Sequence, residues 1–436
     1  MTEKKRFYFI GIKGSGMSAL ALLLHGMGHE VRGSDVEKYF FTEDGLRSAG
    51  IPILSFSPAN LEPGWEVILG NAFPDDHPEA VAARKLGLPM ARYHQFLGAL
   101  LKNYTSVAVT GSHGKTSTTG LLSHVLKAQG PTNYLIGDGT GHGEPGAEYF
   151  ALEADEYRAH FLAYEPTYAI FLNIDFDHPD YYASIDQVYE ANRKFARQVK
   201  AQGLLYSGDP YLAKFQDLNN MLYYGFQDDD EIQAIHIERS AAGAQFDVLV
   251  HGEFYGHFQI HACGDHNILN ALAVIGFCAL ENFEAASVAE ALASFKGVKR
   301  RFNITEKAGY TLVDDYAHHP KEIEATIAAA RQRFPKKPVF AIFQPHTYSR
   351  TLALLDDFAK ALNQADRVYV CDIFSSAREQ DNHQVSADDL LDQLTVPKAH
   401  LHLKDIETLK AHQDAVMLFM GAGDVPKYKE ALEEKL

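Results

Sequence analysis

A chain of 436 residues is too long for one ordinary hydrophobic core, so we expect two or three domains. The composition, 46% hydrophobic and 22% charged, is typical of a globular protein, and a formal net charge of −17 argues against nucleic acid or an anionic membrane as the main partner. The three cysteines lie far apart without a CxxC pair, which indicates neither a disulfide framework nor a zinc ribbon, and no apolar run approaches the ~20 residues that span a bilayer, so we expect a cytoplasmic protein.

The first stretch of the chain predicts a βαβ unit. Residues 7–12, FYFIGI, read as a strand, a glycine turn and a helix follow, and residues 29–35 form a second strand that ends in Asp35. In such a unit the turn cradles phosphate, and the acid after the second strand meets a sugar or a base. The turn's glycines, at positions 11, 14 and 16, do not follow the G-x-G-x-x-G order of dinucleotide sites. The turn therefore favours a nucleotide diphosphate over NAD.

Further alternation completes this first domain. Strands are expected at 67–69 and 89–92, with a helix at 78–86 between them. No low-complexity linker marks the end of the domain, and we place the boundary near Lys102.

The stretch VAVTGSHGKTSTTG, residues 107–120, predicts a second phosphate-binding turn. A short apolar strand leads into Gly111 and Gly114, and Lys115 and Thr116 then open a helix. Backbone N–H groups and the helix N-terminus suit a phosphate, the lysine adds positive charge, and the threonine hydroxyl is of the kind that ligates Mg²⁺. The spacing is shorter than G-x-x-x-x-G-K-[ST], and a solvated glycine-rich turn is the alternative. The order of strand, glycines, Lys-Thr and helix favours ATP.

Polar residues follow two further strands of this second domain. The strand at 149–153 ends in Glu153, and the strand at 168–173 is followed by a segment that contains His178. Each residue alone would commonly be structural. If both strands run parallel to the strand before Gly111, however, Thr116, Glu153 and His178 emerge at one sheet edge and form a reasonable divalent-metal site.

Residues 228–260 are polar and strand-like and predict a small antiparallel addition. A helix follows, capped by Asp265, whose first turn carries His266, Asn267 and Asn270. From spacing alone, these polar side chains either cap the helix or bind a base or phosphate.

A third α/β region begins after the basic cluster GVKRRF, residues 297–302. Three adjacent cations are usually a solvated surface, but at a domain joint Arg301 could reach a phosphate. Strands are expected at 310–313, 337–343, 367–370 and 416–420, each followed by polar residues. The candidates at these strand ends are Asp314, Asp315, His318, His319, His346 and Arg350. For the pair His318-His319, structural or substrate-orienting roles are favoured over metal ligation, since adjacent residues at a helix start point in different directions.

Several motifs along the chain together resemble those of the Mur ligase family. They are TGSHGKTSTTG, EADE, NIDFDHPDYY, GDHNILNALA, GVKRRFN, DDYAHHP, FQPHTYSRT and the terminal GAGD, in the family's order and over nearly the whole chain. Within the family, GIKGSGM with GSD, and DDYAHHP, resemble the branch that joins L-alanine to UDP-N-acetylmuramate.

The resemblance implies a three-domain α/β ligase that uses ATP and Mg²⁺. A Rossmann-like domain (1–102) would bind the UDP-sugar, a central P-loop ATPase domain with a mostly parallel sheet (103–299) would bind ATP, and a Rossmann-like domain (300–436) would bind the amino acid. ATP would convert the sugar's lactyl carboxylate into an acyl phosphate, which the amine of L-alanine attacks.

The resemblance also implies roles for individual residues. The ATP-binding residues would be Gly111, Ser112, His113, Gly114, Lys115, Thr116, Ser117, His266, Asn267, Asn270, Arg301 and Asp315. The metal ligands would be Thr116, Glu153 and His178. The UDP-sugar would lie on Gly14, Ser15, Gly16, Met17 and Asp35. The catalytic group would be Lys115, His178, Arg301, His346 and Arg350.

One departure and three alternatives accompany this interpretation. Several Mur ligases carry a carbamylated lysine past the DH motif; here Lys194 is near that place, and we interpret it as a solvated helix residue. The nearest alternative is a recycling ligase that attaches an intact tripeptide to the same UDP-sugar. The others are an NAD-dependent oxidoreductase and a nucleotide-gated binding protein without ligase activity.

Overall fold

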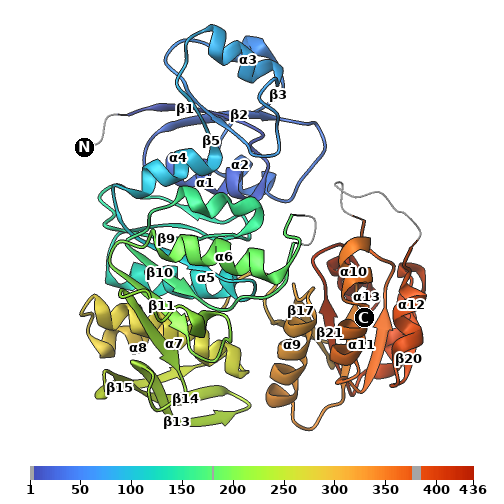
Figure 1. Cartoon of the computed structure of the whole chain (residues 1–436). Helices are drawn as coiled ribbons and strands as arrows, with labels where there is room; N and C mark the ends of the chain where they lie inside the picture. Colours follow the sequence, from blue (N-terminus) through green and yellow to red (C-terminus); the bar gives the residue numbers. More distant parts are fainter. Residues whose placement is uncertain (1–3, 179–180, 376–383) are drawn as a thin grey trace. The chain divides into compact units, whose positions relative to one another are not determined.

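The computed structural model describes residues 4–178, 181–375 and 384–436. The chain forms two compact units. One comprises Met1–Ile235, Asp247–His257 and Leu269–Ser294, and the other comprises His236–Phe246, Phe258–Ile268 and Phe295–Leu436. Three sheets run through the chain in order, each mostly parallel and flanked by helices (Figure 1), which confirms the predicted α/β fold class.

The N-terminal sheet has five parallel strands in the order β3-β2-β1-β4-β5. Its central strand β1 alternates between two apolar layers. Phe7 and Phe9 pack on the side of α1, whereas Tyr8 and Ile10 pack with Trp65 on the other side. The strands are β1 (Arg6–Ile10), β2 (Glu30–Asp35), β3 (Ile53–Ser55), β4 (Glu66–Leu69) and β5 (Met90–Arg92), and the helices are α1 (Ser15–Gly26), α2 (Glu43–Ser48), α3 (Pro78–Lys85) and α4 (Tyr93–Leu101).

Helix α1 packs backbone to backbone on strand β8 (Gly141–His142) of the next sheet. A Cβ atom on Gly141 would lie 1.8 Å from the carbonyl oxygen of Ala19, and one on Gly143 would lie 2.2 Å from that of Leu23. A Cβ on Gly26 would lie 2.2 Å from the carbonyl oxygen of Gly143. Only glycine allows so close an approach, because any side chain there would overlap main-chain atoms.

The central sheet has ten strands in the order β15-β14-β13-β12-β11-β10-β6-β9-β7-β8. The run from β13 to β7 is parallel, and β8 pairs antiparallel with β7. The strands are β6 (Thr105–Thr110), β7 (Thr132–Leu135), β8, β9 (Tyr149–Glu153), β10 (Tyr168–Phe171), β11 (Gln202–Tyr206), β12 (Met221–Gly225), β13 (Ile232–Ser240), β14 (Gly243–Val250) and β15 (Glu253–Ile260).

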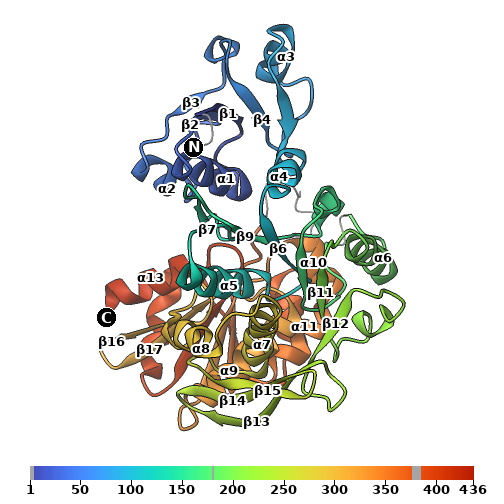
Figure 2. The ribbon, with the colours of Figure 1, turned by 90° about the vertical axis from the view of Figure 1, so that its left-hand side faces the viewer.

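The described residues of the central region form the α-helices α5 (Lys115–Gln129), α6 (Ile185–Ala196), α7 (Asp265–Leu280) and α8 (Ala285–Ser294). α5 and α8 lie side by side (Figure 2), joined by a hydrogen bond from Gln129 to Ser287. Two-residue connections join β13 to β14 and β14 to β15, so these strands reverse direction, in agreement with the predicted antiparallel addition.

The C-terminal sheet has six strands in the order β16-β17-β21-β18-β19-β20, with β16 antiparallel and the rest parallel. Alternate residues of its strands face two separate apolar layers: Ala341 and Phe343 face α9 and α11, whereas Ile342 faces α13. The strands are β16 (Asn303–Lys307), β17 (Tyr310–Asp315), β18 (Val339–Phe343), β19 (Arg367–Val370), β20 (Lys398–His400) and β21 (Val416–Met420), and the helices are α9 (Pro320–Arg333), α10 (Tyr348–Ala353), α11 (Leu355–Leu362), α12 (Ala387–Gln393) and α13 (Val425–Lys435).

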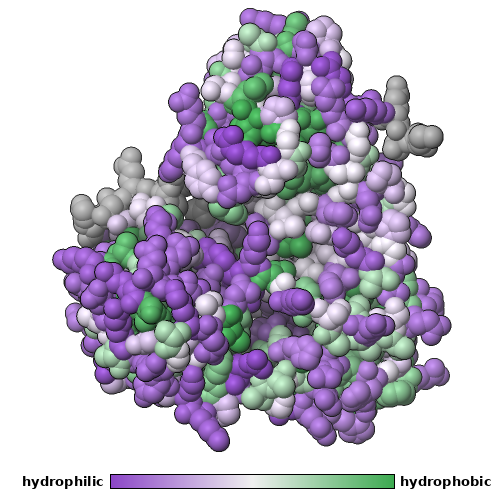
Figure 3. Space-filling view, turned by 180° about the vertical axis from the view of Figure 1, so that it is seen from behind, coloured by the Kyte–Doolittle hydropathy of each residue, from purple (hydrophilic) through white to green (hydrophobic). Residues whose placement is uncertain are grey.

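The surface is mainly hydrophilic on the face that Figure 3 shows, as expected for a strongly acidic chain. The three cysteines are buried and free. Among the described residues, no helix combines the length and the apolar character needed to cross a membrane.

Candidate active site

The turn between β6 and α5 has the predicted form. β6 ends at Thr110, and α5 begins at Lys115. Gly111 and Gly114 have φ angles of +136° and +85°, a region that L side chains rarely adopt. A Cβ on Gly111 would also lie 3.0 Å from the backbone N and O of Asn173. Both glycines are therefore required by the path of the turn, which brings the first N–H groups of a helix to the edge of the sheet.

Asn173 holds this turn from the neighbouring strand. Its Oδ1 accepts a hydrogen bond from the backbone N–H of His113 at 2.8 Å, and its Nδ2 donates to the carbonyl of His113 at 3.0 Å. Ser112 bonds in the same way to the backbone of Asp175. Asn173 was not among the predicted site residues, although its position shortly after β10, beside the end of β6, was a usable signal.

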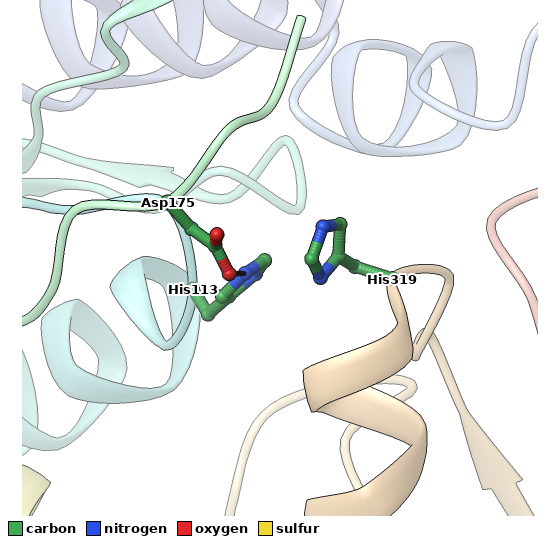
Figure 4. A group of neighbouring side chains, drawn as sticks. All are labelled: His113, Asp175 and His319. Atoms are coloured by element: carbon green, nitrogen blue, oxygen red, sulfur yellow. Dashed lines mark hydrogen bonds and ion pairs between the residues drawn. The ribbon is translucent and has the colours of Figure 1, made fainter. Parts of the chain in front are cut away.

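The side chain of His113 lies beside Asp175, with Nε2 3.3 Å from the nearer carboxylate oxygen (Figure 4). Figure 4 also labels His319, which immediately precedes α9 in the other compact unit.

Lys115 is anchored within the turn rather than extended into solvent. Its Nζ donates to the carbonyl of Gly111 at 2.6 Å and lies 2.9 Å from Oε2 of Glu156 and 3.9 Å from Oδ1 of Asp155. Burial by itself lowers the pKa of Lys115, but the carboxylates of Glu156, Asp155 and Glu153 outweigh it and raise the pKa. The ammonium therefore stays charged at neutral pH.

Glu156 is the buried partner of Lys115 and was not among the predicted residues. It is 1% exposed, and burial raises the pKa of its carboxyl although Lys115 acts in the opposite direction. Within the described part of the chain, its Oε1 has no hydrogen-bond partner. One carboxylate oxygen is thus available to a further cation.

The structure brings together two of the three predicted metal ligands directly. The hydroxyl of Thr116 donates to Oε2 of Glu153 at 2.8 Å, and the backbone N–H of Gly137 donates to the same oxygen at 3.0 Å. His178 instead lies with Asp155 and Glu156: their ligand atoms are within 4.8 Å of one another, a cluster that does not include Glu153. The parallel strands β6, β9 and β10 place all of these residues at one sheet edge, as predicted.

Of the residues at the start of α7, Asn270 reaches the glycine turn. A Cβ on Gly114 would lie 3.3 Å from its Oδ1. Asn267 donates to the carbonyl of Cys263 and lies 3.0 Å from Nε2 of His266, so this pair is engaged with the helix start and the chain before it.

In the N-terminal region, the turn that contains Gly14, Ser15, Gly16 and Met17 opens α1, as predicted. Asp35 is largely committed to this turn. One carboxylate oxygen accepts the N–H of Lys13 at 2.7 Å, and the other accepts that of Val36 at 2.7 Å. The ammonium of Lys13 pairs with the buried Glu43 at 2.6 Å. Buried charges therefore fix the shape of the turn.

In the C-terminal region, Asp315 ends β17 and is buried. Its oxygens accept the N–H groups of Ala317 and Phe302 at 2.8 Å each, and burial raises the pKa of its carboxyl to about 6, partly offset by Arg301. The guanidinium of Arg301 lies 5.1 Å from the ring centroid of Tyr316. Arg301 and Asp315 thus belong to one interacting group.

The remaining candidates lie at the ends of β17 and β18. Nδ1 of His318, just before α9, lies 3.0 Å from Oε2 of Glu322 in the first turn of that helix. The ring of His346 stacks on Phe374 at 5.5 Å, and Arg350, on α10, is 7% exposed. Lys194 is exposed on α6, in agreement with its interpretation as a solvated residue.

Family models match the chain in three consecutive segments: Mur ligase family, catalytic domain (residues 6–105), Mur ligase middle domain (109–278) and Mur ligase, glutamate ligase domain (300–425). The chain is 54% identical to a UDP-N-acetylmuramate–L-alanine ligase from Levilactobacillus brevis, over 99% of this chain and 97% of the relative.

Two solved structures are similar. One is the UDP-N-acetylmuramate–alanine ligase MurC from Thermotoga maritima, with 30% identity, a TM-score of 0.80, and coverage of 99% of this chain and 98% of the other. The second is the UDP-N-acetylmuramate:L-alanyl-γ-D-glutamyl-meso-diaminopimelate ligase from Neisseria meningitides, with 29% identity, a TM-score of 0.59, and coverage of 68% of this chain and 100% of the other.

Proposed function

The chain belongs to the Mur ligase family, and from this premise we propose that it is the ATP-dependent ligase that joins L-alanine to UDP-N-acetylmuramate in peptidoglycan precursor synthesis. The observation that carries the proposal is the 54% identity, over nearly the whole chain, to a UDP-N-acetylmuramate–L-alanine ligase. A ligase that adds a tripeptide to the same UDP-sugar would need the same ATP site. The ATP site therefore does not distinguish L-alanine from a tripeptide as the amine substrate.

The reaction couples amide formation to ATP cleavage. A carboxylate does not react usefully with an amine, so the lactyl carboxylate first takes the γ-phosphoryl group of ATP and ADP leaves. The amine of L-alanine then attacks the acyl carbonyl, and the tetrahedral intermediate collapses to the amide and phosphate. Phosphoryl transfer depends chiefly on positioning and on neutralising charge over the transferring oxygens.

We assign the ATP phosphates to the turn from Gly111 to Ser117. The first N–H groups of α5 point out of the turn, and Lys115 supplies a positive charge that Glu156 and the carbonyl of Gly111 hold in place. Asn270, beside Gly114, lies on the same side of the helix start. His266, Asn267, Arg301 and Asp315 are assigned to the nucleotide by their match to the family's motifs.

The oxygen-rich edge next to Lys115 fits Mg²⁺. Mg²⁺ prefers oxygen ligands, and this edge offers the Thr116 hydroxyl, the Glu153 carboxylate and an unpartnered Oε1 of Glu156 among the described residues, with His178 nearby. We propose that Thr116, Glu153 and His178 hold the ion, with Glu156 completing the negative charge. The ion would neutralise charge on the phosphate oxygens during transfer.

We assign the UDP-sugar to the N-terminal region and the amino acid to the C-terminal region. Gly14, Ser15, Gly16, Met17 and Asp35 would bind the UDP moiety, with Asp35 acting mainly through the shape of the turn. His346 and Arg350 would handle the amino acid. We propose domain limits of 1–102, 103–299 and 300–436 for the UDP-sugar, ATP and amino-acid domains. Because ATP and UDP-sugars are cytoplasmic metabolites, we place the reaction in the cytoplasm.

A phosphate-release assay tests the proposal. Purified protein receives ATP, Mg²⁺ and UDP-N-acetylmuramate, and the acceptor is L-alanine, L-serine, glycine or the tripeptide, with omission of the UDP-sugar as the blank. We expect turnover that depends on both substrates and is greatest with L-alanine. Release only with the tripeptide would identify the recycling ligase instead, and ATP binding without acceptor-dependent ADP formation would reject ligase activity.

A further inference from the structure

Two histidines and two aspartates gather at the carboxyl edge of the C-terminal sheet, and none of them has a role in the ligase site described above. They are Asp372, Asp388, His400 and His402. Neighbouring parallel strands bring three of them together: Val370 of β19 is in register with His400 of β20, and Asp372 follows two residues after Val370; Asp388 lies in the first turn of α12. His400 and His402 alternate along an extended segment and therefore face the same side, with ring centroids 4.3 Å apart.

The distances within this group are close to those of a metal site. Oδ1 of Asp372 lies 2.8 Å from Nε2 of His400, and its Oδ2 lies 3.2 Å from Nδ1 of His402. One ligand atom from each of the three residues lies within 4.8 Å of the other two. Ligand atoms around a tetrahedral ion with bonds of about 2.1 Å are roughly 3.4 Å apart. The two contacts of Asp372 are about 0.6 and 0.2 Å shorter than this spacing, so the side chains would move apart by about that much to admit an ion.

The second nitrogen of His400 provides an independent argument. Its Nδ1 lies 3.1 Å from Oδ1 of Asp388, so both ring nitrogens face carboxylate oxygens. An ion bound at Nε2 would leave the Nδ1–H of the ring to donate to Asp388, and a carboxylate is the usual outer partner of a metal-bound histidine.

We propose that Asp372, His400 and His402 bind a divalent transition-metal ion of the zinc class, and that Asp388 orients His400. Two imidazoles and a carboxylate select such an ion over Mg²⁺, which prefers oxygen ligands alone. Three protein ligands leave a fourth position to water. The ion would tie the chain after β19 to the chain after β20.

This bond would also stiffen the segment that supports His346. Two residues beyond Asp372, the N–H of Phe374 donates to the carbonyl of Pro345 at 2.8 Å, and the carbonyl of Phe374 accepts the N–H of Thr347 at 3.0 Å. An occupied site therefore holds the chain on both sides of His346 more tightly. Its effect on alanine addition rests on the proposed function, whereas the metal site itself does not.

Zinc titration of the full chain tests the site. Calorimetry is run in excess Mg²⁺, which occupies the oxygen-rich site near Lys115, and compares the wild type with His400→Gln/His402→Gln. We expect the wild type to bind one more equivalent of Zn²⁺ than the double variant, and Asp388→Asn to weaken that binding about 10–100-fold. His257→Gln is the matched control, because His257 is exposed and contacts the carboxylate of Asp247 at 2.7 Å, away from the proposed site, and it should change nothing.

Two further measurements keep the outcome decisive. Co²⁺ in place of Zn²⁺ should give the visible absorption of a low-coordinate site in the wild type and not in the double variant. The exposed Asp388 makes Asp388→Asn a variant that should fold even if the double variant does not. Equal zinc stoichiometry and affinity in the wild type and the double variant, or an Asp388→Asn variant with unchanged affinity, would overturn the assignment.

If zinc binds as proposed, the KM for L-alanine in the phosphate-release assay should respond to Zn²⁺ in the wild type and not in the double variant. A wild-type KM that ignores bound zinc would remove the link to His346. Failure of the ligase assay itself would be visible without zinc, so the two proposals fail separately.

Discussion

Replacing Lys115 with methionine tests both its observed ion pair with Glu156 and the ATP-binding role that we propose for it. The substitution leaves a carboxylate that is 1% exposed without its partner at 2.9 Å. Breaking a buried ion pair by removing one member costs about 3–5 kcal/mol. Because Lys115 is itself 11% exposed, we expect the lower half of that range for the loss in free energy of unfolding at pH 7.5.

The loss should depend on pH. Without the ammonium, the pKa of the buried Glu156 carboxyl rises further above the value that it has in the unfolded chain. An acid whose folded pKa is raised destabilises the fold progressively as the pH rises through that pKa. The difference in free energy of unfolding between the wild type and Lys115→Met should therefore be smallest below pH 4.5 and grow toward neutral pH.

The measurement is urea unfolding followed by circular dichroism from pH 4 to 8, with Glu156→Gln added as the matched second substitution. In the double variant the buried charge is absent, so about half of the lost stability should return and its pH dependence should vanish. Turnover should stay about 10²–10³-fold below wild type in both variants. A Lys115→Met protein with wild-type stability at pH 7.5, or with full turnover, would refute this account of the turn.

Three further predictions concern separate sites. Asp315, with a pKa of about 6 in the fold against 3.8 ordinarily, should make the free energy of unfolding fall by about 3 kcal/mol between pH 3.5 and 7, and Asp315→Asn should flatten that slope; an equal slope in the variant would contradict it. A Cβ on Gly137 would lie 2.2 Å from Oε2 of Glu153, so Gly137→Ala should reduce turnover about 10²-fold by displacing that carboxylate. The control Gly45→Ala, in helix α2, should leave turnover unchanged, and equal activity of the two variants would argue against the placement of Glu153. Lys194 should show the mass of an unmodified lysine, and Lys194→Ala should keep most of the turnover; a 44 Da increment on the peptide that contains Lys194, as carbamylation adds, would reverse that interpretation.

The sheet edge could be predicted from the sequence because strand, turn and helix are local features. The apolar runs that end at Gly111, Glu153 and Asn173 predict three strands. Because these strands are parallel, the residues at their carboxyl ends lie at one edge of the sheet. The polar residues at the carboxyl ends of the C-terminal strands, such as Asp315, could be predicted in the same way. Such predictions need only the order of strands and polar residues and no side-chain contacts.

The partners of those residues could not be predicted, because they depend on side-chain positions. Glu156 and Asn173 stand beside residues that were singled out, yet only the folded turn shows that one anchors Lys115 and the other clamps His113. The position of Asp35 after the second strand predicts a contact with a sugar or a base, whereas in the structure both of its carboxylate oxygens accept a backbone N–H. The pair His400 and His402 has alternating spacing, but its significance depends on Asp372, which follows another strand, β19.

The glycine contact between α1 and β8 fixes the position of the helix relative to the central sheet within their unit. Since main-chain atoms touch at Gly141 and Gly143, the helix that opens at Ser15 cannot slide along the sheet that carries the Lys115 turn. If the UDP-sugar and ATP bind the two turns as we propose, the distance between them is set by this main-chain contact and not by side chains that can change rotamer.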